Sequence, residues 1–214
     1  MPAFEGLRLI GVTSMNAKAT PRISDEAADL LFRKARSFND YRPEPVGDDV
    51  LRALYELMKW GPTTANSQPQ RLLFIRSAEA KERLKPALSS ANLKKTMGAP
   101  VVALLAYDMR FFEHLPRFFP DPRARSWYET TPEAIRTTAL RNATLQGAYL
   151  IIAARALGLD CGPMSGFNND KVDAEFFPDG RFKSNFLCCL GYGDPKSLDP
   201  RYERFAFDEV CKIL

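Results

Sequence analysis

The sequence predicts an α+β fold in which a sheet is flanked by helices and one long helix is buried at the centre. Strand-like apolar runs occur at 71–75, 100–107 and 184–193, each bounded by turn residues. Helix-start signals and helical spacing of apolar residues lie between these runs. The stretch 143–157 is apolar on nearly every side and contains small residues that allow close backbone approach, which is typical of a buried central helix.

The expected helices, in chain order, are 24–35, a helix from Asp48 to the Gly61-Pro62 stop, 78–88, 131–158, 169–176 and a short C-terminal helix. Ser24 and Thr131 are the expected caps of the first and fourth of these, because a side-chain oxygen can accept a hydrogen bond from the free amides at a helix start. The helix from Asp48 is expected to bury a face that carries Val50, Leu54, Leu57 and Met58. The CGP stretch at 161–163 is interpreted as a short turn between the long helix and the one at 169–176.

Length and composition predict a soluble protein of one domain, which we place at 23–214 after an N-terminal arm at 1–22 that is partly ordered. No apolar run approaches the ~20 residues that a membrane-spanning helix needs. The net charge of +4 is spread without a basic run, so nucleic acid is not expected as a partner, whereas a small anionic ligand remains open.

Cysteine and histidine usage predicts a reducing compartment and no metal site. The four cysteines form no C-x-x-C pair, and Cys161, Cys188 and Cys189 lie in apolar surroundings typical of buried packing. His114 is the only histidine, so no cluster has metal-ligand spacing. No secretory signal is evident, and we expect the cytoplasm.

Residues 108–131 are aromatic and punctuated by prolines, and they are expected to lack regular structure. Such a segment is either a lid over a binding site or a contact with a second subunit, and the sequence favours neither. As a lid, it would place Arg125 and Trp127 at the substrate, where the arginine can meet a carboxylate and the indole can exclude water. An arginine in a loop is more often simply solvated.

Three polar loops carry the residue types that bind a flat, phosphorylated ligand. The first contains Arg36, Ser37 and Asn39, the second is the run PTTANSQPQ behind the Gly61-Pro62 stop, and the third is the turn GPMSGF. Arginine and hydroxyl groups bind phosphate oxygens, and glycines let backbone amides approach a ligand closely. Taken alone, the first two loops are more often ordinary connections, and the third could also be a tight helix-to-strand connection.

In their order and spacing, the three loops and the basic C-terminal segment resemble the nitroreductase family, from about residue 25 to the end. The resemblance implies an α/β sandwich with a central, mixed, mostly antiparallel sheet, bound FMN, NADH or NADPH as co-substrate, and a homodimer. The segments KWGPTTAN, KERLKPALSS, ALGLDCGPMSGF and the GYGD ending are similar to the malonic semialdehyde reductases of pyrimidine catabolism.

The resemblance also implies the flavin contacts. Arg36, Ser37, Arg201 and Arg204 match the phosphate end, while Asn39 stands where many members have a basic residue near the flavin ring. The remaining matches are Pro62, Thr63, Thr64 and Asn66, contributed by the opposite subunit, then Asn92 and Lys94, and the turn Pro163, Met164, Ser165 and Gly166. Asp199 stands where the family usually has a lysine.

The resemblance implies ping-pong hydride transfer from NAD(P)H through flavin N5 to a small acceptor, with malonic semialdehyde giving 3-hydroxypropionate. The chain needs no catalytic side chain for this chemistry, and it offers no Ser/His/Asp set for hydrolysis. No G-x-G-x-x-G follows a strand, so a Rossmann nucleotide site is not expected. A broad nitro- or quinone-reductase and a non-catalytic flavin-binding protein remain as alternatives.

Overall fold

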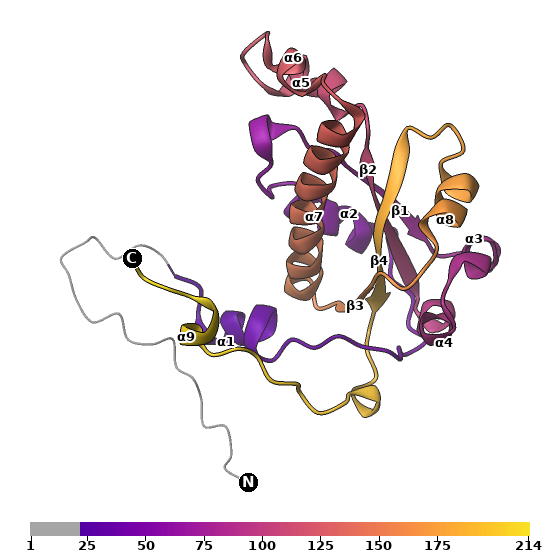
Figure 1. Cartoon of the computed structure of the whole chain (residues 1–214). Coiled ribbons are helices and arrows are strands. Elements are labelled where there is room, and N and C mark those ends of the chain that lie inside the picture. Colours follow the sequence, from indigo (N-terminus) through magenta and orange to yellow (C-terminus); the bar gives the residue numbers. More distant parts are fainter. Residues whose placement is uncertain (1–21) are drawn as a thin grey trace.

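The computed structural model describes residues 22–214 and arranges them in three layers, a sheet between two sets of helices (Figure 1). Within this part of the chain the strands are β1 (Gln70–Ile75), β2 (Val101–Asp108), β3 (Asp160–Met164) and β4 (Phe182–Gly191). They form one sheet in the order β1-β2-β4-β3, and each neighbouring pair is antiparallel. A parallel contact occurs only as the isolated bridge between Ser37 and Cys161 among the described residues. The expected α+β class is thereby confirmed.

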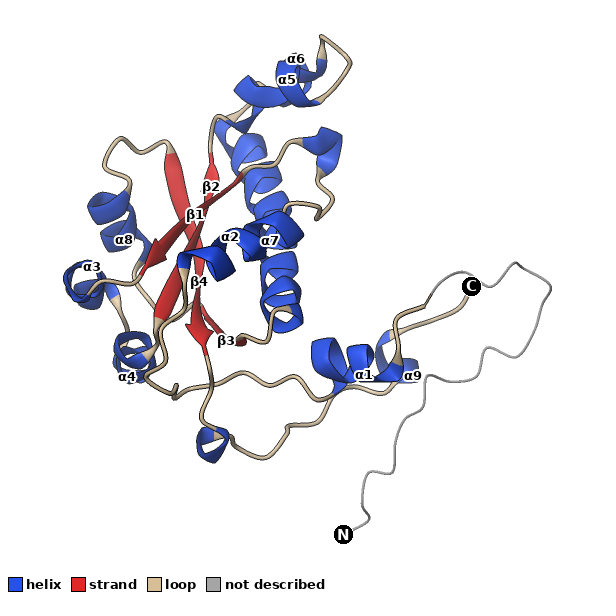
Figure 2. Ribbon diagram, turned by 180° about the vertical axis from the view of Figure 1, so that it is seen from behind, coloured by secondary structure: helices blue, strands red, loops and turns tan. Residues whose placement is uncertain are grey.

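Helices cover both faces of the sheet (Figure 2). One face packs against α2 (Asp48–Met58) and α7 (Pro132–Ala156), and the other against α3 (Ala78–Leu84), α4 (Ser90–Gly98) and α8 (Asn169–Phe176). The remaining described α-helices are α1 (Asp25–Ala28), α5 (Leu115–Phe118), α6 (Ala124–Tyr128) and α9 (Phe207–Val210).

Strand β2 shows why a continuous apolar run is needed at the centre of this sheet. Every residue of β2 is buried, because neighbouring strands flank it and helices cover both of its sides. Val101, Ala103 and Leu105 contact the α2 and α7 layer, whereas the residues between them face α3, α4 and α8. A strand with one solvated face would alternate apolar and polar residues instead.

The expected helix caps are confirmed. Ser24 Oγ accepts a hydrogen bond from the Ala27 amide at 3.1 Å, and Thr131 Oγ1 accepts one from the Ala134 amide at 3.3 Å. Helix α7 ends before Gly158, whose φ of 77° lies in the left-handed region that glycine adopts without strain. Helix α1 continues into a π-helical turn at Asp29–Arg33, so the first helix ends close to its expected limit.

Three local expectations are wrong. Residues 160–164 form β3 rather than a turn, because they pair with β4 at the edge of the sheet, where Pro163 is tolerated. In α2, Leu57 is 46% exposed, and Leu51, Leu54 and Met58 form the buried face. The segment 108–131 is not irregular: it contains short helices at 111–114, 115–118 and 124–128, which cover their own small apolar cluster.

The two ends of the described chain lie outside the three layers (Figure 1). Helix α1 and helix α9 both project from one end of the molecule, and every residue from 199 to 214 is exposed. The expected arm at 1–22 lies outside the described residues except for residue 22. None of the described helices is both long and apolar enough to cross a membrane.

Candidate functional site

The turn after β3 presents two unused backbone amides at the surface. Ser165 and Gly166 are exposed, and their amide nitrogens donate no hydrogen bond to any other described residue. The Gly166 carbonyl accepts hydrogen bonds from the Ser89 amide at 3.1 Å and from Asn92 Nδ2 at 2.9 Å, which fixes the turn against α4. A side chain on Gly166 would collide with the Asn92 amide group, so it would displace the group that fixes the turn against α4. Free amides in a fixed turn are suited to carbonyl oxygens or anionic groups.

The first polar loop lies directly beside this turn. Ser37 forms a bridge with Cys161, and the Phe38 amide donates to the Cys161 carbonyl at 3.0 Å, so the loop runs alongside β3. The Ser37 and Asn39 side chains are exposed, whereas Arg36 is half-buried. Tyr41 supports the loop, because its hydroxyl donates a hydrogen bond to the Phe38 carbonyl at 3.4 Å. Burial raises the pKa of Tyr41, so this hydroxyl stays neutral.

The C-terminal segment reaches the same loop through one of its two arginines. Arg201 donates to the Ala35 carbonyl at 2.9 Å, and Arg36 donates to the backbone carbonyl of Asp199. These two bonds tie the C-terminal segment to the loop that carries Arg36. Arg204 bonds only with the backbone of its neighbours Tyr202 and Glu203 among the described residues, so nothing in the chain ties it to this place.

Helix α4 adds a further cation to this group. Lys94 forms an ion pair with Asp40 at 2.9 Å, and its side chain is 83% exposed. The structure therefore brings the predicted residues of three segments and α4 together at one edge of the sheet. This edge group comprises Arg36, Ser37, Asn39, Asn92, Lys94, Pro163, Met164, Ser165, Gly166 and Arg201.

The predicted residues Pro62, Thr63, Thr64 and Asn66 do not join the edge group. Their loop follows α2 and is held against α7, where the Thr64 amide donates to Asn142 Oδ1 at 2.8 Å. Thr64 Oγ1 lies 2.9 Å from the Tyr128 hydroxyl, and Asn66 Nδ2 donates to the Phe118 carbonyl at 3.2 Å. Figure 1 shows α5 and α6 at the start of α7 and β3 beyond its end, so one chain holds two separate halves.

The backbone of this second loop is strained. Ala65, Asn66 and Gln68 have φ values of 46°, 50° and 43°, in the left-handed region that residues other than glycine seldom adopt. Ser67 is buried, and its hydroxyl has no hydrogen-bond partner among the described residues. Strain of this kind persists where the surroundings enforce it and is common at binding sites.

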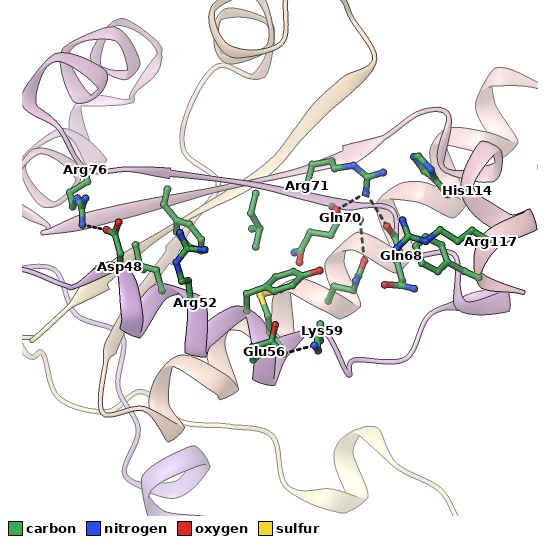
Figure 3. A pocket seen from close by; sticks show the side chains of 17 residues that line it. Asp48, Arg52, Glu56, Lys59, Gln68, Gln70, Arg71, Arg76, His114 and Arg117 are labelled. Atoms are coloured by element: carbon green, nitrogen blue, oxygen red, sulfur yellow. Dashed lines mark hydrogen bonds and ion pairs between the residues drawn. The ribbon is translucent and has the colours of Figure 1, made fainter.

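A groove of about 1020 Å³ separates α2 from β1 and ends at this strained loop (Figure 3). Arg71, His114 and Arg117 lie at one end of it beside Gln68. Behind them the fully buried carboxylate of Asp108 is bound by Arg71 at 2.8 Å and by Arg181 at 3.0 Å. None of the edge-group residues lines the groove.

The two predicted substrate residues lie in α6. Arg125 forms two hydrogen bonds of 3.0 Å with Glu129, so its guanidinium group is already occupied. The Trp127 ring is 47% exposed and meets Phe119 edge-on at 5.9 Å between centroids. Their role at a substrate stays a prediction.

Sequence reasoning missed Asn142 and Tyr128 as supports of the second loop. Asn142 is buried in α7, and a polar amide within an otherwise apolar helical stretch was a usable signal because buried polar groups need partners. Tyr128 gave no comparable signal, since it is one of several aromatic residues in its segment.

The fold and the edge group together define an α+β sandwich that can bind a polar, anionic ligand at the end of its sheet. The chain matches the model of the Nitroreductase family over residues 32–192. A Burkholderia lata protein named as an NADH dehydrogenase/NAD(P)H nitroreductase is 56% identical over 191 residues, which cover 89% of this chain and 98% of that protein. A protein of the same description from Ralstonia nicotianae is 52% identical over 194 residues, which cover 91% of this chain and 100% of that protein.

Solved structures agree on the fold. A nitroreductase from Bacillus subtilis has a TM-score of 0.79 at 22% identity and covers 88% of this chain and 99% of its own. A nitroreductase from Exiguobacterium sibiricum, solved in complex with FMN, has a TM-score of 0.78 at 19% identity. The match covers 91% of this chain and 100% of that chain. The protein belongs to the Nitroreductase family and is therefore an oxidoreductase.

Proposed function

We propose that the protein is an FMN-dependent oxidoreductase that takes its electrons from NADH or NADPH. The observation that carries the proposal is the edge group, where two free amides of one turn lie beside a loop and a C-terminal segment that supply Arg36 and Arg201. FMN has the matching chemistry, because it joins a phosphate to a flat ring with carbonyl and nitrogen acceptors.

The residues of the edge group fit such a ligand from end to end. Arg36, Ser37 and Arg201 would hold the phosphate, since arginine and hydroxyl groups are strong donors to phosphate oxygens. The amides of Ser165 and Gly166 would donate to the ring, and Gly166 keeps that approach open because it has no side chain. When bound, FMN supplies the hydride chemistry itself, and the chain binds it, orients it and excludes water.

The protein is proposed to work as a homodimer, because the two halves of the site do not contact each other through any hydrogen bond or ion pair among the described residues of one chain. The loop at 62–66 is held beside α5 and α6, whereas the edge group is built from β3, α4, the Arg36 loop and the C-terminal segment. A second copy of the chain could bring its own loop to the edge group. Exposed apolar side chains on α2 and α7, such as Leu57, Leu145 and Tyr149, offer a surface for that contact.

The proposed acceptor is malonic semialdehyde, which would give 3-hydroxypropionate. Support comes from the segments KWGPTTAN and ALGLDCGPMSGF, which resemble those of the malonic semialdehyde reductases. The first segment contains the loop at 62–66, and the second contains the turn at 163–166 of the edge group. A broad nitro- or quinone-reductase is the second candidate, and the names of the Burkholderia and Ralstonia relatives favour it.

The decisive experiment uses the purified protein in two steps. Visible absorbance first reports bound flavin, and stopped-flow mixing with NADH or NADPH then follows its bleaching. Reoxidation by malonic semialdehyde, a quinone and a nitroaromatic is compared through kcat/KM. Absence of flavin contradicts the cofactor assignment, and flavin that is not bleached by either nucleotide indicates a non-catalytic flavin-binding protein. A kcat/KM that is highest for the nitroaromatic or the quinone overturns the semialdehyde assignment.

A further inference from the structure

The arginines of the segment 108–131 differ in whether a carboxylate already occupies them. Arg123 pairs with Asp121 at 2.9 Å, Arg125 pairs with Glu129 at 3.0 Å, and Arg110 lies 4.0 Å from a carboxylate oxygen of Glu113. Arg117 has no carboxylate within ion-pair distance in the part of the chain that the structure describes. Its guanidinium carbon lies 4.8 Å from the centroid of the Phe118 ring, which holds the group without neutralising it.

The surroundings of Arg117 favour an anion. Arg117 lines the end of the groove with His114 and Gln68 (Figure 3). The nearby acidic groups are already matched, since Asp108 binds Arg71 and Arg181, and Glu113 binds Arg181 at 3.1 Å. These two carboxylates face three arginines, Arg71, Arg110 and Arg181, so neither of them compensates the charge of Arg117.

Arg117 is also tied to the loop that the proposed function brings to the flavin. Asn66 donates to the carbonyl of Phe118, the residue next to Arg117 in α5. Thr64 bonds with Tyr128 of α6, so α5, α6 and the loop are connected as one unit. When a second chain brings the loop at 62–66 to an edge group, α5 and Arg117 arrive with it.

We propose that Arg117 recognises the carboxylate of an anionic acceptor and thereby selects aldehyde acids over neutral aldehydes. This inference rests on the proposed function, which supplies the hydride at the neighbouring ring. An arginine can bind both oxygens of a carboxylate and so fixes the orientation of a short acceptor. The carbonyl carbon gains the hydride and the carbonyl oxygen gains a proton from solvent water, while the carboxylate is unchanged and stays bound.

The test compares acceptors that carry a carboxylate with related neutral acceptors that lack it, using the full-length holoprotein. One pair is malonic semialdehyde and propanal, and the other is 4-nitrobenzoate and 4-nitrobenzamide. For Arg117→Ala, we expect kcat/KM for the carboxylates to fall by roughly tenfold to a hundredfold, mainly through KM, because a hydrogen bond to a charged group contributes about 1.5–3 kcal/mol. Neutral acceptors should change by no more than about twofold on the same scale.

Matched variants separate charge recognition from a structural role. Arg117→Lys should keep part of the preference for carboxylates, because lysine retains the positive charge but cannot bind both carboxylate oxygens with a planar guanidinium group. Arg110→Ala removes an exposed arginine of the same segment and should leave the ratio between charged and neutral acceptors as in the wild type. FMN content and sedimentation of each variant verify that the fold and the assembly persist.

Several results would overturn the inference. One is an Arg117→Ala protein with an unchanged ratio, and another is a collapse of the ratio in Arg125→Ala instead. A third is a loss of the dimer in Arg117→Ala, since the arginine would then bind a carboxylate of the second chain. Binding of 4-nitrobenzoate and 4-nitrobenzamide to the oxidised protein gives the same comparison without turnover, so a failure of the proposed reaction is distinguishable from a failure of Arg117.

Discussion

At the scale of single residues, the two predicted phosphate ligands Arg36 and Arg204 differ in how the fold holds them. Arg36 is half-buried beside β3, whereas Arg204 is exposed and bonds only locally. We expect Arg36→Ala to weaken FMN binding more than Arg204→Ala, by roughly 1.5–3 kcal/mol, because a charged contact to phosphate is lost from a fixed position. Fluorescence titration of the apoprotein with FMN measures this, with Arg36→Lys as a control that keeps the charge. Equal affinity of wild type and Arg36→Ala would remove Arg36 from the site.

The cysteines make a second prediction at this scale. Burial raises the pKa of Cys189 to about 12, and a hydrogen bond with Cys161 together with burial raises the pKa of Cys188, so both stay as unreactive thiols in the folded chain at mildly alkaline pH. Cys161 is also buried, whereas Cys211 is exposed. We expect a thiol reagent to modify Cys211 rapidly and all four cysteines only in denaturant. The Cys211→Ser variant should then show no rapid reaction, and any rapid phase that remains in it would contradict the buried packing.

At the scale of elements, Gly147 decides how closely α7 approaches the sheet. A Cβ at this position would lie 2.6 Å from Phe186 Cζ and 2.9 Å from Leu105 Cδ2, both side chains of central strands. We expect Gly147→Ala to lower the free energy of unfolding by about 1–3 kcal/mol, because overpacking displaces its neighbours. Denaturant unfolding of the holoprotein measures the change.

A second glycine serves as the control for that experiment. A Cβ at Gly98, in the last turn of α4, meets nothing within 4 Å. Gly98→Ala should therefore leave stability unchanged or raise it slightly, since alanine restricts the unfolded chain more than glycine does. Equal losses in both variants would mean that close packing of α7 is not the cause.

At the scale of the whole molecule, the division of the site into two halves predicts that assembly and cofactor binding are linked. We expect sedimentation to show a dimer at micromolar concentration, because the loop at 62–66 and the edge group do not meet within one chain. Thr64→Ala should keep the fold but weaken FMN binding in the dimer. A monomer that holds one FMN per chain would count decisively against the homodimer.

Much of the fold was predictable because its signals are local. The caps at Ser24 and Thr131, the glycine after α7 and the apolar run of β2 depend on neighbouring residues alone. Strand β3 was not predictable in this way, because it is extended only through its pairing with β4 at the sheet edge. The short helices of the segment 108–131 likewise depend on the apolar cluster that they cover.

The sequence by itself determined the composition of the site: its arginines, its small-residue turn and its amide-rich loop are all visible in the chain. Only the tertiary structure decided which of them meet, because pairing of β3 with β4 brings the Ser165 and Gly166 turn beside α4 and the Arg36 loop. It also holds the loop at 62–66 beside α5, α6 and α7 instead of in the edge group, and it left Arg117 without a carboxylate partner among the described residues, while Arg125 is held by Glu129. The physical reason is that residue types are local properties, whereas distances between segments are set by the packing of helices on both faces of one sheet.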